Sequence, residues 1–352
     1  MGEGIRMTEQ KTMQAAVLRE FHKPLCIEEV PIPEPGPGEV LVQVKASGLC
    51  VTDLHIQDGI IGSVRLPYTP GHEMAGIVRG YGPGAESCGL SLGQHVVCGI
   101  DITCGTCDLC RRGRENLCRN RVRVGFERNG SHAEYAVVPA ANLHPISDDV
   151  PFDQAAIIPD AVACMYHAIR HQGQVAPGDR VLFYGAGGLA LQGVQIAKHL
   201  GAEIFAAART PAKLEKAQAF GASHVINTRQ QDLAEELRRM TDQAMCDVIF
   251  DLVGNGDTID LLLRCVRPGG KVVALAYAAD SFAVNCQELV IQEKEVLGIR
   301  GSTTQDLLDC IRLVEEKKIV PYVSSWYHLG EINTALEALR ACKGLGRSAI
   351  VF

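Results

Sequence analysis

Two separate segments carry the residues of this sequence that are best suited to metal chemistry. Cys50 lies in the segment Gly48-Leu-Cys-Val-Thr-Asp-Leu-His55, and His72 is followed directly by the carboxylate of Glu73. A cysteine thiolate and a neutral imidazole both suit Zn²⁺, and a catalytic zinc ion takes three protein ligands while one position stays open for substrate. A lone cysteine or histidine is usually a packing residue, but this combination predicts a zinc site that needs one further ligand.

Asp160 and Cys164 are the two residues that could supply the third ligand. They lie one helical turn apart, and both a carboxylate oxygen and a thiolate bind zinc. The residues alone leave this choice open.

Four cysteines close together indicate a second metal site of a different kind. Four thiolates in one loop close a tetrahedral zinc shell and leave no position for water, which is typical of a structural site. The alternatives are a redox pair or unpaired core cysteines, but cysteines at every third position are hard to place in a core. We therefore predict a structural zinc ion that holds a loop without a hydrophobic core of its own. Its ligands would be Cys104, Cys107, Cys110 and Cys118.

A glycine-rich turn predicts a dinucleotide-binding site. The turn follows an expected strand over residues 180–184 and begins an expected helix with apolar residues on one face. The first glycine permits a tight turn, the second lets a pyrophosphate approach the backbone, and the alanine at the third position still allows close packing of helix and strand. In another context such glycines could form an ordinary turn. The residues of this turn are Gly185, Gly187, Gly188, Leu189 and Ala190.

The end of the next expected strand indicates which dinucleotide binds. The strand over residues 203–208 ends in Ala208 and is followed by Arg209. A carboxylate here would bind the ribose hydroxyl of NAD, whereas a small residue leaves room for a 2′-phosphate and a guanidinium can bind it. This favours NADP(H) over NAD(H), unless Arg209 is merely an exposed surface arginine.

The elements that position these residues fall into two domains. Residues 13–150 show short strands with period-two alternation between proline- and glycine-rich turns, which predicts a β-barrel-like domain. After Pro151, apolar strands alternate with helices, which predicts a doubly wound parallel sheet. The fold class is therefore α/β. We assign residues 1–163 to the first domain, 164–298 to the second, and expect 299–352 to pack back on the first. Further expectations are a loose extension over residues 1 to about 12, a strand over 132–138, a turn over 267–270 before a strand over 271–277, and a capping box formed by Thr303 and Asp306.

Composition limits the classes of function. The chain has 352 residues, 47% hydrophobic and 21% charged, and a net charge of −7 gives no sign of a nucleic-acid surface. No apolar run approaches the roughly 18 residues of a membrane span, and the first residues lack the apolar segment of a secretory signal. We expect a cytoplasmic protein with no nucleic-acid or membrane partner, in which clustered cysteines bind metal.

Taken together, these motifs resemble those of the zinc-dependent alcohol dehydrogenases of the medium-chain dehydrogenase/reductase superfamily. The resemblance covers nearly the whole chain and includes Gly130-Ser-His-Ala-Glu-Tyr135 as well as the cysteine, histidine and glycine motifs above. It implies a GroES-like catalytic domain packed on a Rossmann domain, two zinc ions per chain, a small alcohol or carbonyl substrate, and a homodimer or homotetramer.

The resemblance also implies catalytic roles. Zinc would act as a Lewis acid toward the alcohol oxygen. Thr52 would accept the hydroxyl proton and pass it through the cofactor ribose to His55, and the hydride would go to the nicotinamide. Glu73 would lie behind the zinc ligands or bind zinc transiently. Arg347 matches a family position that contacts the cofactor.

Two departures from the common family pattern narrow the expected subgroup. Most members have cysteine where this chain has Asp160, whereas the NADP-linked secondary alcohol dehydrogenases and the cyclic hydroxyacyl-CoA dehydrogenases resemble it in having aspartate. Members that use NAD carry an acid where Ala208 stands. The resemblance therefore favours Asp160 as the third ligand and a secondary or cyclic alcohol as substrate.

Two other functions are available to this scaffold. A zinc-free double-bond reductase of the same superfamily would lack the pair Cys50 and His72, and a non-catalytic NADPH-binding protein would not need Thr52 and His55. The presence of all four residues favours the dehydrogenase.

Overall fold

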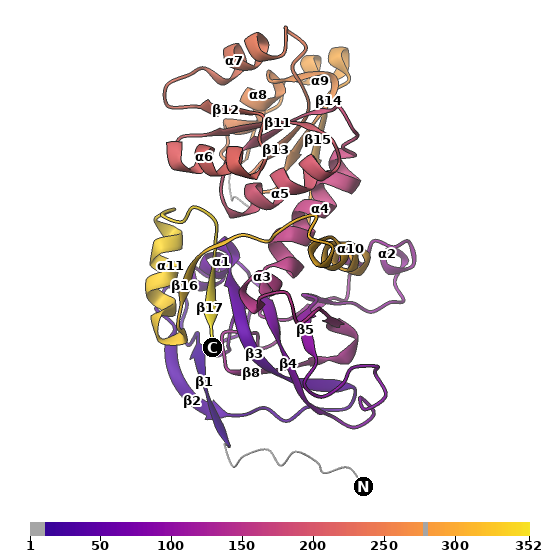
Figure 1. Ribbon diagram of the computed structural model, residues 1–352, viewed down its shortest axis with the longest axis vertical. Coiled ribbons are helices and arrows are strands. Elements are labelled where there is room, and N and C mark those ends of the chain that lie inside the picture. Colours follow the sequence, from indigo (N-terminus) through magenta and orange to yellow (C-terminus); the bar gives the residue numbers. More distant parts are fainter. Residues whose placement is uncertain (1–10, 277–280) are drawn as a thin grey trace.

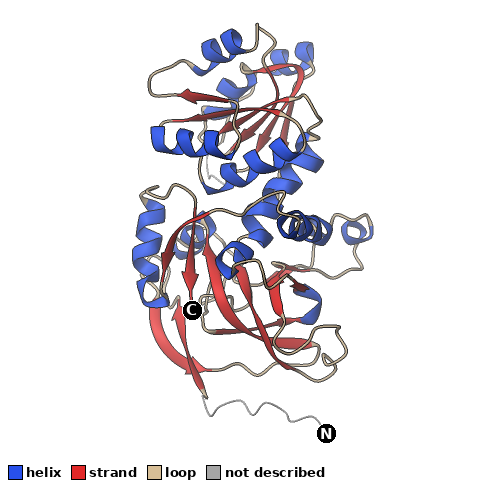
Figure 2. Cartoon of the chain, viewed as in Figure 1, coloured by secondary structure: helices blue, strands red, loops and turns tan. Residues whose placement is uncertain are grey.

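The computed structural model describes residues 11–276 and 281–352, arranged as two domains one above the other (Figure 1). The lower domain is rich in strands and contains both ends of the described chain, and the upper domain is a sheet covered by helices (Figure 2). The expected extension before residue 11, and Tyr277 at the end of a predicted strand, lie outside the described residues.

The upper domain is the predicted doubly wound sheet. Within the described residues it has six strands in the order β12-β11-β10-β13-β14-β15, and every neighbouring pair is parallel. Helices α5 and α6 lie on the side of the lower domain and α7, α8 and α9 on the opposite side (Figure 1). The central strands lack polar alternation because helices bury both faces. The strands are β10 (Arg180–Tyr184), β11 (Glu203–Ala208), β12 (His224–Asn227), β13 (Cys246–Asp251), β14 (Val266–Ala274) and β15 (Glu295–Gly298). The helices are α5 (Gly188–His199), α6 (Pro211–Phe220), α7 (Leu233–Met240), α8 (Thr258–Leu263) and α9 (Cys286–Gln292).

Strand β14 differs from the sequence-based prediction. The segment 267–270 was expected to be a turn before the strand, but β14 already begins at Val266, which pairs with Cys246. The register then shifts, so that the next pair is Val248 with Lys271. The Pro-Gly-Gly residues therefore bulge out of the ladder, and Gly269 adopts a φ of 68° there.

The lower domain is built on a seven-stranded sheet in the described part of the chain, with the order β16-β17-β3-β4-β5-β9 and β8 also paired to β3. Strand β8 begins later than predicted because residues 132 and 133 bond to the segment around Ala15 and Ala16 instead of to β3. The strands are β3 (Glu39–Leu49), β4 (Glu73–Tyr81), β5 (His95–Cys98), β8 (Tyr135–Pro139), β9 (Leu143–Pro145), β16 (Val323–Tyr327) and β17 (Arg347–Val351).

Two short ribbons and several small helices complete this domain. The ribbons pair β1 (Thr12–Val17) with β2 (Cys26–Pro31), and β6 (Asp101–Ile102) with β7 (Val122–Arg123). The helices are α1 (Val51–Gln57), α2 (Asp108–Arg111), α10 (Thr304–Glu315), α11 (Ile332–Arg340) and the 3₁₀ turns Glu115–Leu117, Ala140–Asn142 and Leu329–Glu331.

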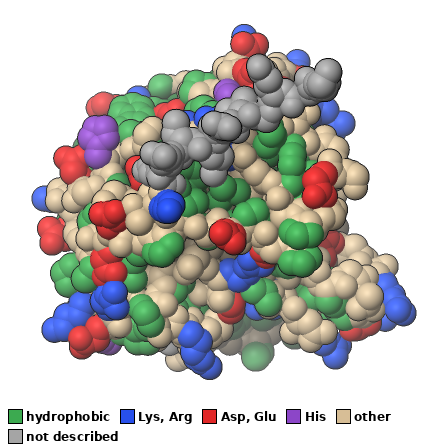
Figure 3. Space-filling view, turned by 90° about the horizontal axis from the view of Figure 1, so that it is seen from below, with side chains coloured by type: hydrophobic (Ala, Val, Ile, Leu, Met, Phe, Trp, Pro, Cys, Tyr) green, Lys and Arg blue, Asp and Glu red, His purple; other side chains and the backbone are tan. Residues whose placement is uncertain are grey.

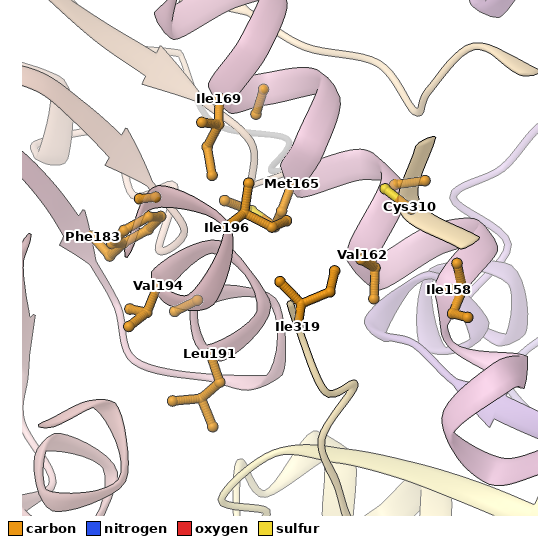
Figure 4. Close-up of a cluster of buried hydrophobic side chains, with 14 of the residues drawn as sticks. Ile158, Val162, Met165, Ile169, Phe183, Leu191, Val194, Ile196, Cys310 and Ile319 are labelled. Atoms are coloured by element: carbon orange, nitrogen blue, oxygen red, sulfur yellow. The ribbon is translucent and has the colours of Figure 1, made fainter. Parts of the chain in front are cut away.

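A helical run over residues 152–173 joins the two domains. It comprises α3 (Phe152–Ala156), a π-helix (Ile158–Val162), α4 (Ala163–His167) and a second π-helix (Ala168–Gly173). Figure 4 shows side chains of this run packed against Phe183 of β10, residues of α5 and Cys310 of α10. The domains therefore share one hydrophobic core at their junction. Each large apolar side chain buried in it contributes about 1.5–3 kcal/mol to the free energy of folding. The proposed boundary at residues 163 and 164 falls inside this run and stays a prediction.

The C-terminal segment returns to the lower domain, as its sequence suggested. Thr303 is the N-cap of helix α10. Its hydroxyl accepts from the Asp306 backbone N–H, and the Asp306 carboxylate accepts from Thr303 N. This is the predicted capping box. Strand β17 then pairs antiparallel with β3, with Ser348 opposite Leu49.

The surface at the lower end of the molecule carries acidic and basic side chains that are interspersed (Figure 3). Among the described residues, no helix combines the length and the apolar character that a membrane crossing requires.

Candidate functional site

Four side chains from three distant segments converge between the two domains. One ligand atom each of Cys50, His72, Glu73 and Asp160 lies within 4.8 Å of the others, and these four residues are called the metal cluster below. Cys50 is the N-cap of α1, the histidine and glutamate stand at the start of β4, and the aspartate lies in the π-helix. His72 and Glu73 are only 2% and 0% exposed. The structure thus brings the predicted ligands Cys50, His72 and Asp160 together.

The π-helix explains why Asp160, and not Cys164, is in this cluster. The wider turn occurs where Pro159 lacks a backbone N–H for a regular helical bond, and π-helical turns are frequent at functional sites. Asp160 Oδ2 lies 3.8 Å from His72 Nε2. Cys164 lines the same cavity from α4 but is not part of the four-residue cluster.

Two residues behind His72 were not predicted from the sequence. Asp53 Oδ1 lies 3.5 Å from His72 Nδ1 and 3.6 Å from His132 Nε2, and His132 Nδ1 is 2.9 Å from the Ser47 hydroxyl. Burial alone would raise the pKa of Asp53, but the two imidazoles lower it well below its ordinary value. An anionic Asp53 orients the His72 ring so that Nε2 points toward the other ligands.

A local signal for Asp53 exists in the sequence. It stands three residues after Cys50, the spacing of a capping box, and its Oδ2 accepts from Cys50 N at 2.8 Å. His132 has no comparable local signal because only long-range pairing brings it beside Asp53.

Arg347 occupies the opposite side of the cluster. Its Nη2 lies 2.7 Å from Asp160 Oδ2 and 2.8 Å from Glu73 Oε1, and the side chain is 5% exposed. Burial would raise the pKa of the Cys50 thiol, but Arg347 and His72 lower it in the net balance. The guanidinium therefore stabilises three acidic groups in a buried position.

The donor set fits a divalent metal such as zinc. Neither carboxylate oxygen of Glu73 has a hydrogen-bond partner of suitable geometry, although both are buried and one pairs with Arg347 by distance. The thiol of Cys50, the imidazole of His72 and the carboxylate of Asp160 have ligand atoms within 4.8 Å of one another, and these are ligand types that a catalytic zinc ion takes.

The four loop cysteines have the geometry of a tetrahedral zinc site. Neighbouring Sγ atoms are 3.5 Å apart for Cys107 and Cys110 and for Cys104 and Cys118, and 4.0 Å apart for Cys104 and Cys110 and for Cys107 and Cys118. A zinc–sulfur bond of about 2.3 Å places the sulfurs of a tetrahedron about 3.8 Å apart. Backbone N–H groups of Thr106 and Cys107 lower the pKa of Cys104 to about 5, which favours the thiolate that binds metal.

A cavity of about 2040 Å³ runs from the metal cluster to the glycine turn of the upper domain. Gly185 follows β10 with a φ of 103°, which side chains rarely adopt, and Gly187 is the N-cap of α5. A Cβ at Gly188 would lie 3.1 Å from Arg347 Cδ, so a side chain at this position would crowd the arginine of the metal cluster. All five predicted turn residues line the cavity.

The end of β11 presents basic groups to the same cavity. Ala208 is 9% exposed there and Arg209 is exposed, and both line the cavity together with Lys213 and Arg229. Lys213 and Arg229 were not named from the sequence. Arg229 follows β12, the strand next to β11, so parallel pairing brings these two arginines to one edge of the sheet.

Thr52 lies on the first turn of α1, and His55 lies on the turn that follows. Thr52 Oγ1 is 3.4 Å from Cys50 Sγ, and both Thr52 and His55 line the cavity. Burial lowers the pKa of His55, Asp58 opposes the shift and Arg340 adds to it. The imidazole is therefore mainly neutral at neutral pH and can accept a proton.

Comparisons with known proteins agree with this arrangement. A family model described as the alcohol dehydrogenase GroES-like domain matches residues 36–148, and one described as zinc-binding dehydrogenase matches residues 188–316. An alcohol dehydrogenase of Rhizobium meliloti is 33% identical over 96% of this chain and 98% of its own length.

Similar sequence identity is found with a dehydrogenase of another substrate and with an alcohol dehydrogenase of known structure. An L-threonine 3-dehydrogenase of Chromobacterium violaceum is 33% identical over 79% of this chain and 81% of its own length. A crystal structure of an NAD-dependent alcohol dehydrogenase superposes with a TM-score of 0.91 at 30% identity and covers 97% of this chain and 100% of that one.

Proposed function

Because this chain belongs to the zinc-type medium-chain alcohol dehydrogenases, we propose that it interconverts a secondary or cyclic alcohol and its carbonyl compound with NADP(H). The observation that carries the proposal is the convergence of Cys50, His72 and Asp160 in one cavity with the glycine turn. The choice of a secondary or cyclic alcohol follows from Asp160, because the NADP-linked secondary alcohol dehydrogenases also have aspartate at this position. A homodimer or homotetramer, the assembly implied by the family, belongs to the same proposal and is checked by light scattering.

Cys50, His72 and Asp160 would hold the catalytic ion. Zinc would supply Lewis acidity toward the substrate oxygen, and the nicotinamide ring would carry the hydride. Asp53 keeps the His72 ring in its binding orientation from a distance of 3.5 Å. Arg347 fixes the Asp160 carboxylate, so the ligands are positioned before substrate enters.

Helix α1 supplies the groups that move the proton. Thr52 lies beside Cys50, where its hydroxyl can accept the substrate proton, and His55 lies one helical turn further along. Because its pKa is lowered, His55 can take up this proton and release it near neutral pH. Reduction of a carbonyl compound would use the same path in reverse.

The proposed preference for NADP(H) depends on the end of β11. Ala208 leaves space where a carboxylate would repel a phosphate, and Arg209 offers a guanidinium beside it. One relative of known structure is an NAD-dependent alcohol dehydrogenase, so the coenzyme preference is our inference for this chain from these two residues.

The decisive experiment is an initial-rate assay of the zinc-loaded protein with NADP⁺ and NAD⁺ over primary, secondary and cyclic alcohols. We expect turnover with a secondary or cyclic alcohol and a higher kcat/KM with NADP⁺. Failure to reduce either coenzyme with any alcohol, or turnover that persists without bound zinc, would contradict the proposal.

A further inference from the structure

Besides Arg209 and Arg229 at the coenzyme end and Arg347 in the metal cluster, three more arginines line this cavity: Arg121, Arg123 and Arg300. Two of them are fully paired. Arg300 Nη1 and Nη2 donate to the two oxygens of Asp101 at 2.8 and 3.1 Å. Arg123 Nη2 and Nε donate to the two oxygens of Glu127 at 2.6 and 3.1 Å. These bidentate pairs use the charge that the two arginines could offer to a ligand.

Arg121 has no such pair. Its Nη1 donates to the Cys118 carbonyl at 3.0 Å, and among the described residues no carboxylate oxygen lies within 4.0 Å of its guanidinium. The two carboxylates of this region, Asp101 and Glu127, are already held by Arg300 and Arg123. Three guanidinium groups therefore share two carboxylates here, and an anionic ligand would supply the missing negative charge.

The part of the cavity lined by Arg121, Arg123 and Arg300 lies next to the metal cluster. Arg123 Cζ is 4.0 Å from the centroid of the Phe126 ring, and that ring is 5.3 Å from the centroid of the His72 ring. Arg121 and Arg123 line the cavity while the residue between them, Val122, does not and is 37% exposed. This alternation places both guanidinium groups on the cavity side of the ribbon.

The four-cysteine loop positions Arg121. The loop connects β6 to β7, and the carbonyl that accepts from Arg121 belongs to Cys118, the last of the four cysteines. A metal bound by the loop would therefore fix the backbone that holds the arginine at the cavity wall.

We propose that Arg121 binds an anionic group of the substrate, so that the substrate class is a hydroxy or oxo compound that carries a carboxylate or a phosphate away from the reacting carbon. This deepens, and depends on, the proposed dehydrogenase function. Apart from the bond of Nη1 to the Cys118 carbonyl, the N–H donors of Arg121 have no acceptor among the residues that the structure describes. A guanidinium binds a carboxylate or a phosphate in a bidentate manner.

Calorimetric titration of the zinc-loaded protein with NADP⁺ tests the proposal through binding. The probes are β-hydroxybutyrate and γ-hydroxyvalerate with their neutral amides, and glycerol phosphate with glycerol. We expect wild type to bind at least one anion about tenfold or more tightly than its neutral partner, the effect of one charged hydrogen-bonded pair. The series that shows the preference distinguishes carboxylate from phosphate.

Arg121→Gln should remove this preference and leave the affinity for the neutral partner unchanged. Arg119→Gln is the matched control, because Arg119 lies two residues away on the exposed side, pairs with Asp108 at 3.2 Å and is outside the cavity wall. Equal thermal unfolding midpoints of the two variants exclude a folding defect. Lack of any anion preference in wild type, or a preference that survives in Arg121→Gln, would overturn the proposal.

Initial rates separate this inference from the proposed function. An anion preference in binding without reduction of NADP⁺ or NAD⁺ by any alcohol would refute the dehydrogenase and with it the role of the anion as substrate. Turnover of neutral alcohols without an anion preference would refute only the assignment of Arg121. If the dehydrogenase function and the anion-binding role of Arg121 are both correct, Arg121→Gln should raise KM for the anionic alcohol and leave kcat for neutral alcohols unchanged.

Discussion

The guanidinium of Arg347 donates to Asp160 Oδ2 at 2.7 Å, although 187 residues separate the two in the sequence. The bond connects the C-terminal strand β17 to the π-helix between the domains. The same Nη2 lies 2.8 Å from Glu73 Oε1. The acidic side of the metal cluster is therefore complete only after the last strand of the chain has paired with β3.

Asp160→Ala should remove the catalytic ion, because the carboxylate is one of three groups that face one another in the cluster. We expect metal content to fall from about two zinc ions per chain to about one, the ion left in the closed four-cysteine site. Cys164→Ala is the control and should keep both ions. The measurement is elemental analysis of dialysed protein, and the opposite pattern would identify Cys164 as the ligand.

Cys50→Ser and Cys107→Ser should separate catalysis from stability. Cys50 lies in the buried cluster between the domains, whereas Cys107 lies in a separate loop where four thiols face one another. We expect Cys50→Ser to lose turnover with little change in the thermal midpoint, and Cys107→Ser to lower the midpoint as metal is lost. A folding defect in Cys50→Ser would show that its ion is also structural.

Arg209→Ala should weaken NADP⁺ far more than NAD⁺. Loss of a guanidinium contact with a phosphate should reduce kcat/KM for NADP⁺ by about tenfold or more. Ala208→Asp should act in the same sense and favour NAD⁺. Arg239→Ala, which removes an exposed arginine paired with Glu236 at 2.6 Å on α7, is the control. Equal losses with both coenzymes would refute the assignment.

His55→Gln should alter the pH profile of alcohol oxidation. The neutral imidazole accepts the proton, and because its pKa is lowered, wild type should keep its rate down to a pH below about 6.5. The variant should be about tenfold slower at neutral pH and gain rate as pH rises, since solvent base replaces the imidazole. Profiles of kcat/KM check this, with His199→Gln, an exposed histidine at the end of α5, as control. Identical profiles would exclude His55 from the proton path.

Asp306 should make stability depend on acid pH. It accepts from His167 Nδ1 and His171 Nε2, each at 2.8 Å, and from Thr303. Burial would raise the pKa of Asp306, but His167 and Thr303 lower it well below the ordinary value. Because the native pKa lies below the unfolded value of about 3.9, this contribution is fully present above that pH and is lost as pH falls further.

Asp306→Asn should therefore lower the free energy of unfolding by about 1–3 kcal/mol at neutral pH. The difference from wild type should shrink as pH approaches 3, because both proteins then lack the charge. Urea denaturation at several pH values measures it. Asp309→Asn, whose partner Arg312 is an exposed neighbour on the same helix, should show a smaller and less pH-dependent loss.

The sequence by itself was sufficient to predict most of the strands of the parallel sheet and the chemical types of the candidate metal ligands. Strands β10 and β11 have the predicted bounds, and the capping box at Thr303 was recognised from two residues. Such features depend on neighbours within a few positions, so local pattern is sufficient. Cys104 and its three partners belong to this class as well, because a single loop brings them within reach of one another.

Only the tertiary structure decided which groups face one another inside the cavity. The π-helix turns Asp160 into the cluster, and His132 reaches Asp53 because residues 132 and 133 pair with β1. Arg123 and Arg300 are paired with carboxylates, whereas Arg121 has none in the described part of the chain. These relationships depend on strand register and on domain packing between segments far apart in the chain. No local spacing encodes them, since one residue of register shift would turn each side chain to the opposite face.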